Sequence, residues 1–310
     1  MKSIFLIERQ GVNTTFQDKG RFGFQHLGIP PSGSMDNFLS QVANKLVGNN
    51  LDQAVIEFAY QGPLLKLNSG TAHVSIAGNV KFEIIKKNGK SSEGLSNSSF
   101  YLEEGDKLDI TSTVKSIYGY LAVEGGFGLK KVSESYSTLL KAKIGPNKGE
   151  KLSNKQEIFF YGTKNNKNKR ILFEKEENEI IRVIEGQQAD YFSKKSIDDF
   201  YSKEYKVTNL IDRMGARLEG SKLENIKSPN IKSEGISKGS IQVPGDGQPI
   251  VLLSDHPTIG GYPKIANVIT ADYDKLIQKT PGSKLKFKLV DLSVAESAFQ
   301  SYTKKLNFFK

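Results

Sequence analysis

The region from Ala54 to Leu152 is divided into short apolar runs, each bounded by glycine, asparagine or serine. Runs of this length and alternation are typical of half-buried strands. The dipeptide Asn88-Gly89 between two of them is a strong hairpin turn. Many short strands with few helices favour an antiparallel barrel or sandwich. The predicted strands are Val55–Ala59, Leu64–Leu67, His73–Ile76, Lys81–Ile85, Lys107–Ile110 and Tyr118–Val123.

One strong helix is predicted before this region, over residues 35–47. Its apolar residues recur at three- and four-residue steps, which places them on one face. Ser34 is the expected N-cap, Asp36 lies in the first turn where the helix dipole favours it, and Gly48 ends the helix.

The 310 residues are enough for two domains. Residues 164–179 are polar and highly charged, so we place a linker there, between an N-terminal lobe (1–163) and a C-terminal lobe (180–310). The second lobe contains predicted strands at 180–184, 249–253, 265–269 and 284–290, and short helices near 196–203 and 271–278. Ser293 and Glu296 form a capping box that opens a last helix. The fold class predicted is mainly β, a β-rich α+β protein with a few short helices.

Composition excludes several classes of protein. There is no cysteine, so disulfides and thiolate metal sites are impossible. No apolar run approaches the roughly 18 residues of a membrane span, and the N-terminus lacks the apolar core of a signal peptide. We therefore expect a soluble cytoplasmic protein without a membrane partner. The net charge is +10, but the lysines are dispersed, so a solvated surface is favoured over a nucleic-acid partner.

Common catalytic motifs are missing. The sequence has no Walker loop, no G-x-G-x-x-G between a strand and a helix, and no G-x-S-x-G. The three histidines do not have metal-ligand spacing, so no metal site is predicted. His73 fits a buried structural position in a strand. His26 and His256 lie in polar loops, where a catalytic role and simple hydrogen bonding to the backbone are both open.

The stretch from Ser233 to Lys264 places a predicted strand between two turn clusters dense in glycine and proline. Such turns fix backbone geometry and are a common way to mount binding loops. Ordinary hairpin turns remain the alternative. The polar residues that these turns carry are Gln242, Asp246, Gln248, Asp255, His256, Thr258 and Lys264.

Several motifs together resemble one known family. The stretches 14–21 (TTFQDKGR) and 26–36 (HLGIPPSGSMD) resemble the N-terminal signature of the biotin-dependent carboxyltransferase family, which includes allophanate hydrolase subunit 2-like proteins and the C subunit of 5-oxoprolinase. The stretch 212–220 (DRMGARLEG) is similar to its central motif. The stretches 233–235 (SEG), 241–249 (IQVPGDGQP) and 260–264 (GGYPK) are similar to its C-terminal signature. The motifs occur in order over nearly the whole chain.

The resemblance implies two cyclophilin-like β-barrel lobes and a partner-dependent activity. The leading interpretation is the C subunit of an ATP-dependent 5-oxoprolinase, an amide (lactam) hydrolase that opens 5-oxoproline to L-glutamate. Its implied partners are an A-subunit-like chain and a B-subunit-like chain, the latter similar to allophanate hydrolase subunit 1. ATP with Mg²⁺ is the implied cofactor, on this chain or on a partner.

Two other interpretations follow from the same resemblance. One is the carboxyltransferase subunit of a biotin-dependent urea or amide carboxylase. Biotin would then have to come from a separate carrier, because no Met-Lys-Met is present. The other is a non-catalytic regulatory protein that binds a kinase inhibitor of the B-subunit-like type.

The resemblance also suggests a site for a small cyclic amide. Negative charge on the ring oxygen calls for rigidly held cations or N–H donors, so Arg213 and Lys264 are the catalytic candidates. Asp246, Asp18 or Asp36 could accept a proton or orient a base, and Asp246 is the one chosen as a catalytic candidate. Bracing of loops by the same charges is the alternative. The predicted substrate-binding set is Gln17, Asp18, Arg21, His26, Ser32, Ser34, Asp36, Arg217, Gln242, Gln248, Asp255, Thr258, Gly260, Gly261 and Tyr262.

Two departures from the family pattern bear on this site. Residues 134–138 and 145–150 lack two arginines that relatives often have, which puts an anion subsite there in doubt. His256-Pro257 stands where relatives usually have Arg-Gln, which weakens a catalytic role for His256.

Overall fold

The computed structural model describes residues 2–162, 167–172 and 179–308, with side chains described as far as residue 305. These residues fall into two units, each with its own core. The N-terminal unit contains residues 2–21, 32–162 and 167–172. The barrel unit contains residues 22–31 and 179–308.

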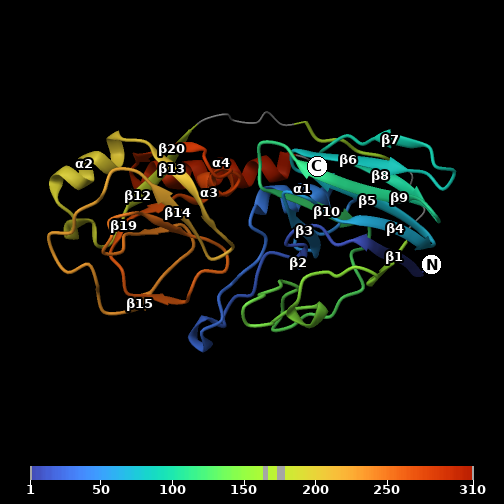
Figure 1. Ribbon diagram of the computed structural model, residues 1–310, viewed down its shortest axis with the longest axis horizontal. Coiled ribbons are helices and arrows are strands. Elements are labelled where there is room, and N and C mark those ends of the chain that lie inside the picture. The colour runs from blue at the N-terminus through green and yellow to red at the C-terminus, as the bar shows by residue number, and fades with distance from the viewer. Residues whose placement is uncertain (1, 163–166, 173–178, 309–310) are drawn as a thin grey trace. The chain divides into compact units, whose positions relative to one another are not determined.

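Two antiparallel sheets build the N-terminal unit (Figure 1). The six-stranded sheet has the order β11-β1-β4-β9-β6-β7, and the five-stranded sheet has the order β2-β3-β10-β5-β8. The strands of the first are β11 (Glu157–Tyr161), β1 (Lys2–Arg9), β4 (Leu64–Ser69), β9 (Lys107–Thr113), β6 (Val80–Ile85) and β7 (Ser91–Glu93). Those of the second are β2 (Thr15–Gln17), β3 (Val55–Ala59), β10 (Tyr118–Val123), β5 (Thr71–Ala77) and β8 (Ser98–Glu103).

A single apolar core joins the two sheets. Phe5, Leu65 and Phe82 enter it from the six-stranded sheet, and Ile56 and Val74 from the five-stranded sheet, all almost fully buried. Burial of large apolar side chains is the main favourable term in folding. Helix α1 (Asn37–Leu46) packs on the five-stranded sheet through its contacts with β5 and β10.

The second unit is a closed barrel with the strand order β12-β19-β16-β17-β14-β13-β20 (Figure 1). Neighbouring strands are antiparallel except β12 and β20, which run parallel and close the barrel. The strands are β12 (Ile180–Glu185), β13 (Tyr205–Ile211), β14 (Gly215–Glu219), β16 (Ser240–Gln242), β17 (Ile250–Leu252), β19 (Lys264–Val268) and β20 (Lys284–Leu289). Full closure leaves these strands no unpaired edge.

Helices and a small sheet complete the barrel unit. Helix α2 (Lys194–Ser202) packs on β20, where Phe200 stacks on Phe287 at 4.7 Å between ring centroids. Helices α3 (Thr270–Ile277) and α4 (Leu292–Phe308) contact each other and β12. Strands β15 (Glu234–Gly235) and β18 (Ile259–Gly260) pair as a separate two-stranded sheet, which we call the flap.

The prediction of a mainly β protein with few helices is confirmed, and the barrel expectation is met in the second unit. Strands β3 (Val55–Ala59) and β10 (Tyr118–Val123) begin and end at the predicted residues. The strands that were not predicted are β2, β7, β8 and β11 in the N-terminal unit and β13, β14, β15, β16 and β18 in the barrel unit. Strand β8 lies in a serine-rich stretch, and β11 owes its place to pairing with the distant β1.

The helix start needs a correction. Ser34 was predicted as the N-cap, but the helix begins at Asn37 and Asp36 is the cap. The Asp36 carboxylate accepts a hydrogen bond from the Leu39 amide at 2.8 Å. Aspartate is as good a cap as serine, and the two lie two residues apart, so the sequence signal is ambiguous here.

Part of the predicted linker, residues 164–166 and 173–178, lies outside the described residues, as does residue 163 before it. The described part pairs with the N-terminal unit: Ser99 N donates to Lys169 O at 2.8 Å and Ile171 N donates to Asn97 O at 2.9 Å. The segment Phe22–Pro31 groups with the barrel unit, although it lies within the predicted N-terminal lobe. No described helix is both long enough and apolar enough to cross a bilayer.

Candidate functional site

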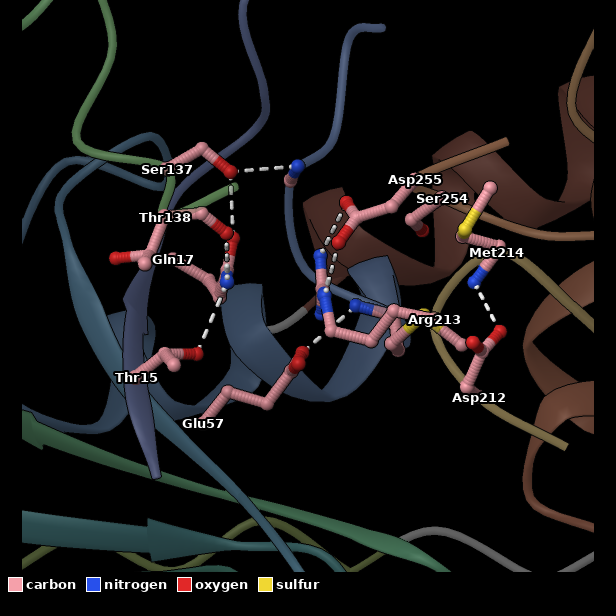
Figure 2. A network of polar contacts seen from close by, with 12 residues as sticks. Thr15, Gln17, Glu57, Ser137, Thr138, Asp212, Arg213, Met214, Ser254 and Asp255 are labelled. Atoms are coloured by element: carbon pink, nitrogen blue, oxygen red, sulfur yellow. Dashed lines mark hydrogen bonds and ion pairs between the residues drawn. The ribbon is translucent and has the colours of Figure 1, made fainter. Parts of the chain in front are cut away.

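Gln17 and Ser137 form the centre of a buried polar network in the N-terminal unit (Figure 2). The Ser137 hydroxyl donates to Gln17 Oε1 at 2.5 Å and accepts from Gly33 N at 2.6 Å. Gln17 Nε2 donates to Thr15 Oγ1 and to Thr138 O, each at 3.0 Å. Gln17 therefore ties β2 to the segment that contains Ser137.

Asp18 and Arg21 hold the same segment from the other side. The Asp18 carboxylate accepts hydrogen bonds from Ser135 Oγ and from Tyr136 N, both at 2.7 Å. Arg21 is 1% exposed, and its Nη2 donates to Ser137 O at 2.6 Å. We call residues 132–138 the anchored segment. In this structure, three predicted binding residues are engaged in fixing it.

Glu57 and Tyr120 fix the start of helix α1. Glu57 Oε2 accepts from Met35 N at 2.7 Å and from the Tyr120 hydroxyl at 2.8 Å. The Tyr120 oxygen in turn accepts from Asp36 N at 2.7 Å. Burial raises the pKa of Tyr120 well above its usual value, and the negative charges of Glu57 and Asp36 raise it further. The phenol therefore stays protonated and can donate to Glu57.

Ser32, Ser34 and Asp36, also predicted to bind substrate, are buried in the N-terminal unit. Ser34 N donates to Asp18 O at 2.8 Å. Ser32 has a φ of 56°, in the left-handed region that costs energy for a residue with a side chain. His26 differs: it lies in the 3₁₀ turn Gln25–Leu27 of the barrel unit and is exposed.

In the barrel unit, Arg213 pairs with Asp255 through two parallel contacts. Arg213 Nε lies 2.9 Å from Asp255 Oδ2, and Nη2 lies 3.1 Å from Oδ1 (Figure 2). Both side chains are nearly buried, at 10% and 6% exposure. The fork geometry of arginine suits such two-point contacts with a carboxylate. The pair joins the turn before β14 to the turn after β17.

Arg217 and Asp246 form a more exposed ion pair. Asp246 also accepts from Gln248 N at 3.1 Å, and Gln248 Oε1 accepts from Gly220 N at 3.0 Å. Contacts within the barrel unit thus link Asp246, the predicted proton acceptor, to Arg217 and Gln248.

Lys264 is nearly buried and pairs with Glu234 of the flap. Gln188 Nε2 donates to the same Glu234 oxygen at 2.9 Å. Hydrogen bonds from Lys264, and then from Gln188, lower the pKa of Glu234 against the opposing effect of burial. The ammonium of Lys264 therefore faces an ionised carboxylate.

The remaining predicted residues of the Ser233–Lys264 stretch surround the flap. Gln242 is buried, and its Nε2 donates to Tyr262 O at 3.4 Å. Thr258 O accepts from Ile236 N, and Gly261 O accepts from Ile231 N. A Cβ at Gly260 would come within 2.6 Å of Gln242 Nε2, so a side chain there would require the Gln242 amide to shift. Tyr262 is 41% exposed.

His256 is buried beside this region, and its Nδ1 lies 2.6 Å from Pro257 O. Burial lowers the pKa of His256, and the positive charge of Lys238 adds to that effect, while the Pro257 carbonyl and Asp255 oppose it. The contact with a carbonyl fits a neutral ring that carries its proton on Nδ1. His73 is also buried, with Nδ1 at 2.9 Å from Glu124 Oε2, in agreement with a structural position.

Sequence reasoning did not select four residues that organise these networks: Glu57, Ser137, Gln188 and Glu234. One signal was available for Glu57, since a carboxylate in the middle of the apolar run VIEFA needs a buried partner. Ser137, Gln188 and Glu234 gain their roles from contacts distant in sequence, which spacing alone does not reveal.

Comparison with known proteins places these features in a family. The sequence pattern of the carboxyltransferase domain, subdomain A and B, matches residues 27–289. The chain belongs to this carboxyltransferase domain family.

Two curated relatives are each named as the C subunit of 5-oxoprolinase. The protein from Haemophilus influenzae is 32% identical over 281 residues, covering 91% of this chain and 89% of the relative. The protein from Escherichia coli is 31% identical over 306 residues, covering 95% and 94%. Among solved structures, the Kluyveromyces lactis urea amidolyase has a TM-score of 0.89 at 25% identity, and covers 99% of this chain. This chain spans 20% of that larger protein.

Proposed function

We propose that this chain is the C subunit of a 5-oxoprolinase that opens 5-oxoproline to L-glutamate in the cytoplasm, together with A-subunit-like and B-subunit-like partners and ATP. The observation that supports this most strongly is the near full-length match to two proteins of that name. The urea amidolyase of Saccharomyces cerevisiae is less similar, at 27% identity, and the chain spans only 16% of it.

The chemistry expected of the barrel unit is stabilisation of negative charge. Ring opening of a lactam develops charge on the carbonyl oxygen, and fixed cations lower the energy of that state. Arg213 and Lys264 are fixed and nearly buried, as this role requires. Asp246 is the proposed proton acceptor, and its exposure of 49% leaves it accessible to solvent.

We place ATP and Mg²⁺ on a partner chain. A triphosphate needs a cradle of backbone N–H groups and uncommitted cations. The cationic candidates of the barrel unit each have a carboxylate partner, namely Asp255 for Arg213, Asp246 for Arg217 and Glu234 for Lys264. These residues do not fit a triphosphate, so no step is assigned to ATP on this chain.

Reconstitution tests the proposal. The purified chain is mixed with the A-subunit-like and B-subunit-like chains of the same source, and glutamate release from 5-oxoproline is measured with and without ATP. Release that needs all three chains and ATP supports the proposal. An intact complex that releases no glutamate contradicts it.

Site variants within the active complex test the residues. Arg213→Ala and Lys264→Ala are expected to abolish turnover, while Arg213→Lys and Lys264→Arg keep the charge and separate catalysis from bracing. If the charge-conserving variants fold, assemble and turn over like the original chain while the alanine variants lose their fold, the side chains act as braces.

The second candidate is a carboxyltransferase acting on urea or another amide. The high TM-scores with the Kluyveromyces lactis urea amidolyase and urea carboxylase, 0.89 each, favour it. Such a reaction would draw on biotin from a separate carrier protein. Carboxylation that avidin inhibits, in place of glutamate release, would select this candidate.

A further inference from the structure

The pairing of Lys264 with Glu234 joins two parts of the barrel unit that differ in how firmly they are held. Lys264 lies on barrel strand β19 and its side chain is 4% exposed. Glu234 lies on the flap and its side chain is 39% exposed. A buried ammonium needs a counter-charge, because removal of its partner leaves a charge in a poorly solvated position.

The flap is short, and one further backbone hydrogen bond lies on each side of its ladder, from Ile236 N to Thr258 O and from Ile231 N to Gly261 O. Two residue pairs form its ladder, Glu234 with Gly260 and Gly235 with Ile259, and it is separate from the seven barrel strands (Figure 1). Residues 226–230, which lead to it, are all exposed. Segments with few buried contacts are the ones that open at low free-energy cost. Glu234 can therefore leave Lys264 without disruption of the barrel.

The donors at this position have the chemistry of a carboxylate site. Lys264 Nζ and Gln188 Nε2 both donate to Glu234 Oε1. Gln188 is itself oriented, since its Oε1 accepts from Lys264 N at 3.3 Å. Gly186 precedes it on the same turn, where a Cβ would come within 2.3 Å of Lys264 O, so the turn is packed closely against β19.

We propose that Lys264 and Gln188 form a binding site for a small carboxylate, which Glu234 occupies from within the chain until a ligand displaces it. The class of ligand is a small monocarboxylate. If the proposed function holds, the ligand is 5-oxoproline bound through its carboxylate; this last identification rests on that function, whereas the site itself rests on the contacts above. Lys264 would then anchor substrate, in addition to stabilising charge.

Removal of the internal carboxylate tests the site without any assay of turnover. Glu234→Ala is expected to lower the melting temperature of the chain, because Lys264 loses its counter-charge. Added formate or acetate should raise it again in a saturable way, whereas chloride at equal ionic strength should not. In Glu234→Ala/Lys264→Met the response to formate should disappear.

A matched control is Glu204→Ala, which breaks the pair with Lys284 in the same unit. Both of its members are exposed, at 50% and 62%, so no buried charge is left behind. If formate stabilises Glu234→Ala no more than Glu204→Ala, the inference is wrong. If Glu234→Ala does not fold, Glu234→Gln replaces it, because glutamine keeps the shape of the side chain. Formate should raise the melting temperature of Glu234→Gln more than that of the original chain. An equal rise in both would contradict the proposed carboxylate site.

Two further ligands separate this inference from the proposed function. 5-Oxoproline should stabilise Glu234→Ala, and 2-pyrrolidinone, the same ring without the carboxylate, should not. Stabilisation by formate but not by 5-oxoproline supports the site and contradicts its assignment to that substrate. Glutamate release by the complex with no formate effect on the variant supports the function and overturns the site.

Discussion

Arg213 and Asp255 face each other as a two-point ion pair, with contacts of 2.9 and 3.1 Å between nearly buried groups. A backbone hydrogen bond links the same two residues, from Asp255 N to Arg213 O at 2.7 Å. Side-chain and backbone contacts between the same two residues make this a firmly defined element of the candidate site. The Asp255 carboxylate fixes the orientation of the guanidinium from one edge.

Asp255→Ala should lower the free energy of unfolding by about 3–5 kcal/mol, because it leaves a nearly buried guanidinium without its counter-charge. Urea denaturation measures the change. Asp190→Ala is the control: it breaks the exposed pair of Lys227 and Asp190 and should cost at most about 1 kcal/mol. Equal effects of the two variants would show that the Arg213 pair is not a buried brace.

The anchored segment should loosen when Asp18 is changed. Asp18→Ala removes the acceptor for Tyr136 N and for the Ser135 hydroxyl, so amide hydrogen exchange should accelerate at Tyr136 and its neighbours. Exchange is followed by mass spectrometry or NMR. Asp52→Ala, which breaks an exposed pair with Lys19, should leave residues 132–138 unchanged. Unaltered exchange in Asp18→Ala would count against the anchoring role.

Tyr120→Phe should destabilise the N-terminal unit by about 1–3 kcal/mol, since it leaves Glu57 and the amide of Asp36 each short of one buried hydrogen bond. Chemical denaturation gives the value. Tyr161→Phe is the matched control, because Tyr161 is 69% exposed and its change should stay within about 0.5 kcal/mol. A loss no larger than the control would mean that water replaces the phenol at little cost.

His256 should make stability fall in mild acid. Its pKa is lower in the folded chain than the usual 6.5, so the unfolded chain takes up the proton first as the pH falls. The free energy of unfolding should therefore decrease as the pH drops through about 6.5, and His256→Asn should flatten that part of the profile. Urea denaturation across the pH range tests this.

The same pH series separates the effect of Glu234 on stability from that of His256, because the two effects fall in different pH ranges. The pKa of Glu234 is lowered, so its contribution is lost only in more acidic solution, below the usual value of 4.5. Glu234→Gln should leave the step near 6.5 in place. If both variants changed the same region of the profile, the assignment of the mild-acid step to His256 would fail.

The mainly β fold could be predicted from the sequence because each strand has its own alternation and turn residues. Val55–Ala59 is one example. The candidate site residues were chosen from sequence motifs, which did not reveal the partners of their side chains. Gln17 and Ser137 are 120 positions apart, and Gln188 and Glu234 are 46 apart. Such contacts depend on which distant segments come together in the folded chain, and the spacing of residues within one motif does not specify that.

The chain passes between its two units more than once. Residues 22–31 group with the barrel unit, yet residues 21 and 32 on either side of them belong to the N-terminal unit. If the chain were cut between residues 162 and 179, the N-terminal product would carry residues 22–31, which group with the barrel unit. The C-terminal product would lack these residues. Gene fission at that point is therefore expected to give two chains that are each less stable than the corresponding unit of the intact chain.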